Sequence, residues 1–180
     1  MATKAAKKAA PKARTMQIYR AVDGVIDTPE MGDPSILPMS PETMAGFGRL
    51  VEAGITDGSM VKTLFDIPGF SLTYAWFKPH YPLPRHSHKQ DCLYYIVSGK
   101  IKLGTEWLGA GDGFFLPDAT PYTYVVGDEG VELLEFRTSN DINFKSFNHT
   151  AAWWDKAEKS IRENRAAWQA MIPPRAALTA

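Results

Sequence analysis

Between positions 59 and 138, short apolar and aromatic runs alternate with breaks made of Gly, Pro and Asp-Gly. Runs of about four to eight residues bounded by such breaks are typical of β-strands. Their regular spacing indicates a β-sandwich or a barrel. The sequence predicts strands at 60–67, 70–77, 92–97, 100–103, 113–116, 122–126 and 131–136, with tight turns at Ser98-Gly99 and from Gly104 to Trp107.

Two segments outside this region show helical signals. Ser40 is suited to cap a helix that begins at Pro41, and Thr150 is suited to cap a second helix over about 150–171. One face of the second helix is apolar, and it carries Trp154, Ala157, Ile161, Trp168 and Met171. The chain therefore divides into a tail (1–15), loops with a short helix (16–58), a barrel (59–138) and a C-terminal segment (139–180).

Composition and charge narrow the function classes. The chain has 180 residues, enough for one domain with a substantial core. It has no apolar run near the ~20 residues that cross a bilayer and no secretory signal pattern. With Cys92 as the lone cysteine, we expect a cytoplasmic protein that does not bind membranes.

Charge is distributed unevenly along the chain. Residues 1–14 carry five of the 20 basic residues and no acidic residue, which indicates a disordered basic tail. The remainder holds 15 basic and 20 acidic residues. An acidic body gives no electrostatic reason to expect specific nucleic-acid binding.

Candidate chemistry begins with the pair His86 and His88. Residues i and i+2 of a strand point to the same face, so both imidazoles can reach one point inside a barrel. Neutral imidazole is a good ligand for Fe, Zn, Cu, Ni and Mn. The pair on its own fits equally well with two ordinary strand histidines.

The surrounding residues resemble the cupin superfamily. His86, His88 and Gly99 match the first cupin motif, G(X)5HXH(X)3–4E(X)6G, while Gly111 and Pro117 match part of the second, G(X)5PXG(X)2H(X)3N. The resemblance implies an all-β cupin-type double-stranded β-helix, a jelly-roll barrel with flanking helices. It also implies a small-molecule substrate and a divalent metal ion, with Fe(II) favoured and Zn, Mn or Ni as alternatives. Many cupins are dimers, so we expect a homodimer, and the Trp-bearing helix is a candidate interface.

Two positions depart from the cupin motifs. Cys92 occupies the place of the usual Glu ligand, and Tyr122 occupies the place of the usual third His. We expect His86, His88 and Cys92 to hold the metal, because a thiolate is a strong ligand for soft metals. Cysteine dioxygenase, another cupin, resembles this chain in having a Cys here, but it keeps the third His. Tyr122 is the candidate catalytic residue, since a phenol can act as a general acid or base.

The remaining candidates are pocket residues. Gln90 is placed to orient a histidine or to supply an oxygen ligand. Apolar and aromatic walls are typical of small-molecule sites. The sequence predicts such walls from Tyr94, Trp76, Phe115 and Phe136.

Three functions are consistent with these residues. The sequence favours an Fe(II)-dependent oxygenase, which would need open metal positions for O₂ and substrate. A metal-dependent isomerase, epimerase or lyase would use Tyr122 for proton transfer. A non-catalytic small-molecule-binding protein would explain why two of the usual cupin ligands are missing.

Overall fold

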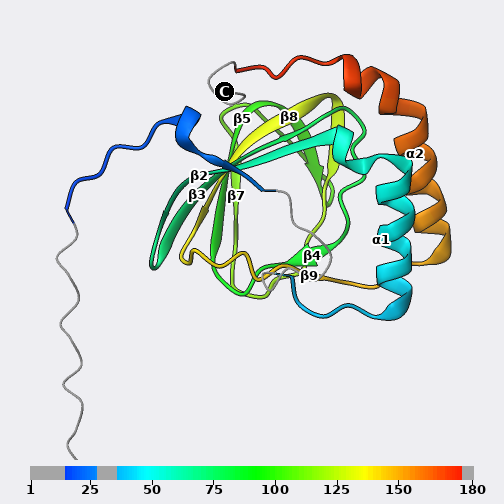
Figure 1. The fold of residues 1–180 in the computed structure, drawn as a ribbon, viewed down its shortest axis with the longest axis horizontal. Helices are drawn as coiled ribbons and strands as arrows, with labels where there is room; N and C mark the ends of the chain where they lie inside the picture. The colour runs from blue at the N-terminus through cyan, green and yellow to red at the C-terminus, as the bar shows by residue number, and fades with distance from the viewer. Residues whose placement is uncertain (1–14, 28–35, 176–180) are drawn as a thin grey trace, which may run out of the picture.

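The computed structural model describes residues 15–27 and 36–175, so almost all of the predicted disordered tail lies outside the described residues. Seven strands form one antiparallel sheet with the order β1-β2-β3-β8-β5-β6, and β7 also pairs with β5 (Figure 1). The strands are β1 (Val25–Ile26), β2 (Ser59–Ile67), β3 (Phe70–Phe77), β5 (Cys92–Leu103), β6 (Glu106–Gly109), β7 (Gly113–Leu116) and β8 (Val125–Arg137).

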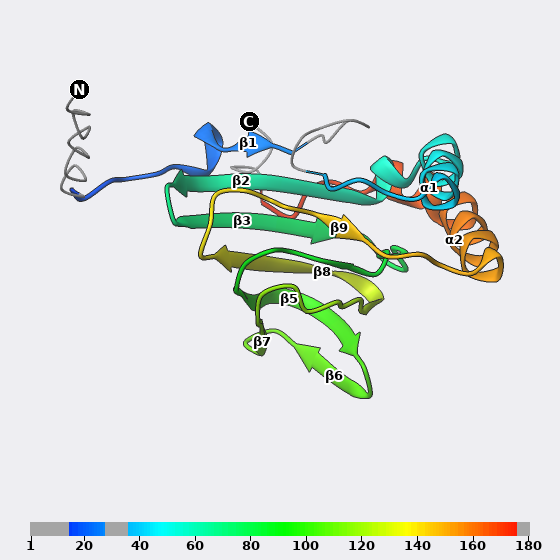
Figure 2. The same ribbon diagram turned by 90° about the horizontal axis from the view of Figure 1, so that it is seen from below.

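A second, two-stranded sheet lies beside the large one. It pairs β4 (His86–Ser87) with β9 (Lys145–Ser146), and His86 also forms an isolated bridge with Tyr122. Figure 2 shows the large sheet curving from β1 to β6, with β9 crossing in front of it. Within the described residues, β1 and β6 do not pair with each other. The sheet is therefore open, and the prediction of a closed jelly-roll barrel is wrong on this point.

The strand alternation decides which side chains enter the core. The concave side of the sheet buries one apolar cluster that includes Ala75, Phe77, Cys92, Tyr94, Ile96, Ile101, Tyr122, Tyr124, Val126, Val131 and Leu133. The other side of β3 carries a separate cluster around Tyr74 and Trp76, packed with Met60 and Met171. Burial of these apolar side chains is the main stabilising contribution to the fold.

Two predicted breaks are not turns. Strand β5 runs through Ser98-Gly99, and β8 joins the end of the predicted run 122–126 to the run 131–136. Gly99 has φ 73° inside β5, where the pairing with β8 is irregular, and a Cβ on Gly99 would overlap the Gly130 carbonyl. The glycine thus permits a close approach of two strands, not a hairpin. The predicted turn near Gly104 is present, because β6 follows β5 there.

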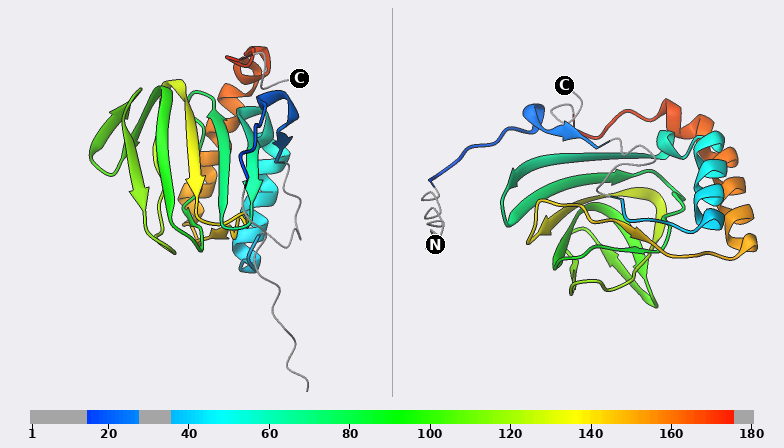
Figure 3. Two further views of the ribbon diagram at one scale, coloured as in Figure 1. Left: turned by 90° about the vertical axis from the view of Figure 1, so that its left-hand side faces the viewer. Right: turned by 60° about the horizontal axis from the view of Figure 1, so that its bottom comes forward.

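The helices lie together at one end of the sheet (Figures 1 and 3). Helix α1 (Pro41–Ala53) begins after Ser40, whose hydroxyl accepts from the Thr43 N–H, and α2 (Ala151–Ala170) begins after Thr150, whose hydroxyl accepts from the Trp153 N–H. Two short 3₁₀ helices, η1 (Ala21–Asp23) and η2 (Ile55–Gly58), complete the described elements.

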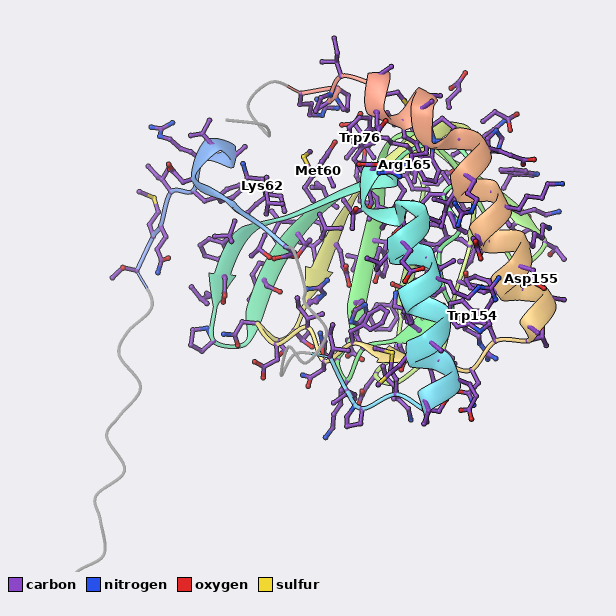
Figure 4. The ribbon with its side chains drawn as sticks, turned by 45° about the vertical axis from the view of Figure 1, so that its right-hand side comes forward. Met60, Lys62, Trp76, Trp154, Asp155 and Arg165 are labelled. Carbon is purple, nitrogen blue, oxygen red and sulfur yellow. The ribbon has the colours of Figure 1, made fainter. Side chains whose placement is uncertain are left out.

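The Trp-bearing face of α2 packs inside the chain. Trp154, Ile161 and Trp168 are buried in one cluster with residues of α1 and η2. Figure 4 shows Trp154 between the two helices. This face is therefore not the homodimer interface for which the sequence made it a candidate, and the homodimer itself stays a prediction. In the described part of the chain, no helix combines the length and apolar character needed to cross a bilayer.

Two neighbouring glycines of α1 give a matched stability test. A Cβ on Gly46 would overlap the Trp154 indole, whereas a Cβ on Gly48 would meet nothing within 4 Å. We expect Gly46→Ala to lower the free energy of unfolding by about 1–3 kcal/mol through overpacking. Gly48→Ala should raise it by about 0.5–1 kcal/mol, since Ala is the better helix former. Urea titration of both variants checks this, and equal effects would contradict the packing.

Candidate functional site

The two histidines are fixed by backbone groups on both sides. Strand β4 places His86 between Ser146 of β9 and Tyr122, whose N–H donates to the His86 carbonyl over 2.8 Å. The His86 Nδ1 lies 2.8 Å from the Pro84 carbonyl oxygen, and the His88 Nδ1 lies 2.7 Å from that of Ile142. A carbonyl only accepts, so each Nδ1 carries the proton and each neutral ring has a lone pair on Nε2.

A chain of hydrogen bonds runs from His86 through two tyrosines to a carboxylate. The His86 Nε2 lies 2.8 Å from the Tyr122 hydroxyl, which lies 2.6 Å from the Tyr94 hydroxyl. Tyr94 in turn donates to Glu135 Oε1 over 2.7 Å. Arg137 donates to both oxygens of Glu135 over 2.7 Å each, from Nε and Nη2. All five side chains are buried.

The charge states along the chain follow from burial and from Arg137. Burial alone would raise the pKa of Glu135, but the neighbouring guanidinium outweighs it and lowers this pKa to about 2. Burial, followed by repulsion from His88, lowers the pKa of His86 to about 4. Burial and the Glu135 charge raise the pKa of Tyr94 and of Tyr122 well above their usual value. Near neutral pH, Glu135 is ionised while His86 and both tyrosines are neutral.

The proton count leaves Tyr122 in an unusual position. Ionised Glu135 accepts the hydrogen bond of the Tyr94 hydroxyl, so the Tyr94 oxygen can only accept from Tyr122. The lone pair of His86 Nε2 can also only accept. Tyr122 therefore has one proton and two neighbours that need it, both within hydrogen-bonding distance. One more proton at this point would satisfy all three short contacts.

Glu135 and Arg137 were not among the candidates from the sequence. They follow the buried Val131 and Leu133 at every second position of β8, so all four side chains share one face. Charged residues in a strand are usually exposed. The signal that could have revealed them is that they have the same strand parity as the two apolar residues before them, which predicts that they face the core as well.

Cys92 and Gln90 lie close to this series of hydrogen-bonded side chains. Cys92 is buried, its thiol donates to the Gln90 carbonyl over 3.6 Å, and burial raises the pKa of the thiol to about 12. The Gln90 Nε2 donates to the Asp141 carbonyl over 2.8 Å. Its Oε1 is buried with no hydrogen-bond partner among the described residues, which leaves an acceptor open to a ligand or to water.

The structure does not bring Trp76, Phe115 and Phe136 to this site. Trp76 packs on the opposite side of β3, Phe115 is 57% exposed on β7, and Phe136 lies against Phe70. Each of the three alternates with neighbours that point inward, so strand parity turns it outward. Their predicted role as pocket walls is therefore wrong.

A small cavity of about 240 Å³ lies next to His88. It is lined by Leu37, Ser87, His88, Lys89, Asp118, Ala119, Asn143 and Lys145. Ala119 and Asn143 have φ values of 56° and 45°, and such left-handed conformations in residues with a side chain are concentrated at functional sites. The His88 ring lies 5.2 Å from the His86 ring between centroids, so a residue that lines the cavity neighbours the first member of the hydrogen-bonded series.

The donor atoms in the site do not fit a resident metal ion. The Cys92 thiol is held protonated, His86 Nε2 contacts the Tyr122 hydroxyl, and both Glu135 oxygens accept from Arg137. The part of the chain that the structure describes contains no group of three or more His, Cys, Asp or Glu residues that could hold a metal ion. His86, His88 and Cys92 therefore do not form, as they lie, the ligand set that the sequence predicted.

Comparisons with known proteins address the fold. No family model matches the chain, and no curated protein sequence matches it. Among solved structures, an RmlC-like cupin from Shewanella frigidimarina NCIMB 400 is 22% identical, with a TM-score of 0.42, and the match covers 46% of this chain and 78% of that one. The likeness covers part of the fold.

Two further structures show a similar partial likeness. The polyketide cyclase RemF from Streptomyces resistomycificus is 19% identical, with a TM-score of 0.48, over 59% of this chain and 82% of that one. KdgF from Halomonas sp. is 22% identical, with a TM-score of 0.40, over 47% of this chain and 82% of that one. The likeness concerns the fold alone.

The buried carboxylate gives a pH-dependent stability. The folded-state pKa of Glu135 is about 2, below its ordinary 4.5, so its contribution is present above pH 4.5 and is lost as the pH falls through 2. The folded-state pKa of His86 is about 4, below its ordinary 6.5, so its neutral burial reduces stability progressively as the pH falls from 6.5 to 4. We expect the free energy of unfolding to fall steadily as the pH drops below about 6.5.

The variant Glu135→Gln separates the two contributions. It should cost about 3–5 kcal/mol at neutral pH, because Arg137 is left buried and uncompensated, and it should flatten the decline below pH 4.5. Glu129→Gln, at an exposed position, should change stability by no more than about 0.5 kcal/mol. Urea unfolding over the pH range checks both, and an unchanged slope in Glu135→Gln would refute the assignment.

Proposed function

We propose that this chain binds a small organic molecule beside His88 and transfers a proton on it through Tyr122 and His86, without a resident metal ion. The observation that carries the proposal is the single Tyr122 proton shared between two acceptors. A site that is one proton short is suited to take a proton from a substrate and to return it at another atom. That is the chemistry of an isomerase or a lyase.

The roles of the residues follow from the direction of the hydrogen bonds. His86 is the acceptor, because the Pro84 carbonyl fixes its proton on Nδ1 and leaves Nε2 toward Tyr122. Tyr122 exchanges its proton with His86, and the substrate would have to reach this pair past the His88 ring. Tyr94 and ionised Glu135 are positioning residues, since they withhold a second proton from Tyr122.

The second candidate is the Fe(II)-dependent oxygenase favoured by the sequence. One observation supports a metal-dependent enzyme: both imidazoles donate Nδ1–H to backbone carbonyls, as metal-binding histidines usually do. Such an enzyme would need a third protein ligand, which would have to come from a rearrangement of the Glu135–Arg137 pair.

Metal content separates the two candidates directly. Protein purified without chelator or added metal should contain far less than one equivalent of Fe, Zn, Mn or Ni. Its melting temperature should not change when these ions are added. One equivalent of tightly bound metal that is lost in His86→Ala would overturn the proposal and favour the oxygenase. Oxygen uptake then identifies the reaction.

Proton transfer itself is tested by isotope exchange. We expect the protein to exchange carbon-bound hydrogens of small hydroxy and oxo acids in deuterated water, measured by NMR. Tyr122→Phe should slow this exchange about a hundredfold or more. Tyr124→Phe is the matched control, since Tyr124 is a buried neighbour on the same side of the sheet. No exchange with any member of the set would favour a non-catalytic binding protein.

A further inference from the structure

The outer face of the large sheet carries an apolar row that crosses five strands, which follow one another in Figure 2. The row consists of direct cross-strand partners, namely Phe65 of β2, Leu72 of β3, Phe136 of β8, Leu93 of β5 and Phe115 of β7. Tyr95 shares this face, because it follows Leu93 by two positions along β5. Antiparallel sheets that face water on one side usually carry polar residues there, so an apolar outer row indicates a covering layer.

The chain covers only one end of this row with its own residues. The outer side of β3 is packed against Ala21 and Met171, and Leu72 is 6% exposed. On β5 and β7, by contrast, Leu93 is 51% and Phe115 is 57% exposed. The exposed part of the face, here called the bare patch, consists of Leu93, Tyr95 and Phe115. Large apolar side chains that gather on one exposed face mark an interaction surface.

A second uncovered apolar surface lies on the N-terminal arm, residues 15–20. Figures 1 and 2 show this arm as an extended segment that leaves the sheet near β1 and β2 and runs away from the body. The Tyr19 ring lies 5.9 Å from the Phe65 ring between centroids, so the arm begins at one end of the outer row. Met16 is 90% and Ile18 is 76% exposed. Successive side chains of an extended segment point to opposite sides, so these two lie on the side of the arm away from Phe65.

The orientation of the arm indicates what covers the bare patch. Met16 and Ile18 point away from the sheet to which Tyr19 attaches the arm, so they are available to another molecule. We propose that the chain forms a symmetric dimer in which the arm of each copy packs on the bare patch of the other. Such an exchange covers both apolar surfaces of both chains. The inference goes beyond the proposed function, because the bare patch lies on the face of the sheet opposite the buried cluster around Tyr122.

The area of the two surfaces matches what a dimer needs. An aromatic side chain buries about 150–250 Å² when it is fully covered, so a half-exposed one contributes roughly 100 Å². The contributing side chains are Met16, Ile18 and Tyr19 of the arm and Leu93, Tyr95 and Phe115 of the bare patch. Counted on both copies, they supply on the order of 1,200 Å², the lower end of the range for stable and specific interfaces.

Sedimentation of the full chain tests the dimer. The parent chain should sediment as a dimer at micromolar concentration. Leu93→Glu should weaken the dimer about a hundredfold or more, because it buries an unpaired charge in the interface. Val51→Glu is the matched control, since Val51 is 56% exposed on α1, outside the bare patch, and it should leave the dimer unchanged. A monomeric parent chain, or equal dissociation constants for the two variants, would overturn the proposal.

Disulfide trapping tests the exchange of arms, and it does not depend on a variant that weakens the dimer. Ile18→Cys chains are mixed with Phe115→Cys chains and then oxidised, and the mixed disulfide should form in high yield. A mixture of Ile18→Cys with Val51→Cys is the control and should give at least tenfold less. Cys92 is buried, so its thiol does not compete. Equal yields in the two mixtures would overturn the proposal.

A single chain that carries both Ile18→Cys and Phe115→Cys distinguishes exchange from folding back. Exchange predicts that oxidation links two chains, which denaturing electrophoresis without reductant detects as a species of twice the mass. A disulfide closed within one chain would place the arm on its own bare patch, and this result would also overturn the proposal.

Discussion

The ion pair between Glu135 and Arg137 determines the direction of the buried hydrogen bonds that run from it to His86. A lone carboxylate at this depth would take up a proton, and it would then donate to its neighbours as readily as it accepts. The bidentate guanidinium keeps it charged, so Tyr94 donates its proton to this carboxylate and cannot donate to Tyr122. Hydrogen bonds in a medium of low polarity are strong and mutually polarising, which makes their direction hard to reverse. The state of His86, three contacts away, is thus decided by a residue that it does not touch.

The same pair explains how this site differs from a metal centre. In a metal centre, a cation held by several ligands sets the orientation of each imidazole and the charge of each carboxylate. Here the cation is covalently part of the chain, since Arg137 supplies the positive charge that Glu135 requires. The backbone carbonyls of Pro84 and Ile142 supply the orientation of the two rings. The two rings are thus oriented by backbone groups, and His86 faces a tyrosine hydroxyl.

Much of this could be predicted from the sequence, and the failures have identifiable causes. The helix starts at Ser40 and Thr150 depend on local capping chemistry, which a sequence displays directly. The two histidines depend on strand alternation and on the motif, and both are local as well. Glu135 and Arg137 were not predicted because charged residues of a strand are usually exposed, and what buries these two is the packing against β5, which a local pattern does not show. The prediction for Trp76, Phe115 and Phe136 fails because strand parity, and not aromatic character, determines which side of the sheet a side chain faces. The break at Gly99 was misread because its cause is Gly130, far away in the sequence.

The junction between the helical layer and the sheet has a consequence for how the molecule comes apart. The Lys78 ammonium, just past the end of β3, donates to the carbonyl of Trp168 near the end of α2, and the Trp168 indole N–H donates to Pro79. Each element thus satisfies a polar group of the other at a half-buried position. If the last turn of α2 frayed, a lysine and a carbonyl would lose their partners together, so the fraying would be costly. Helix α2 and strand β3 should accordingly melt as one unit, although Lys78 and Trp168 are 90 residues apart along the chain.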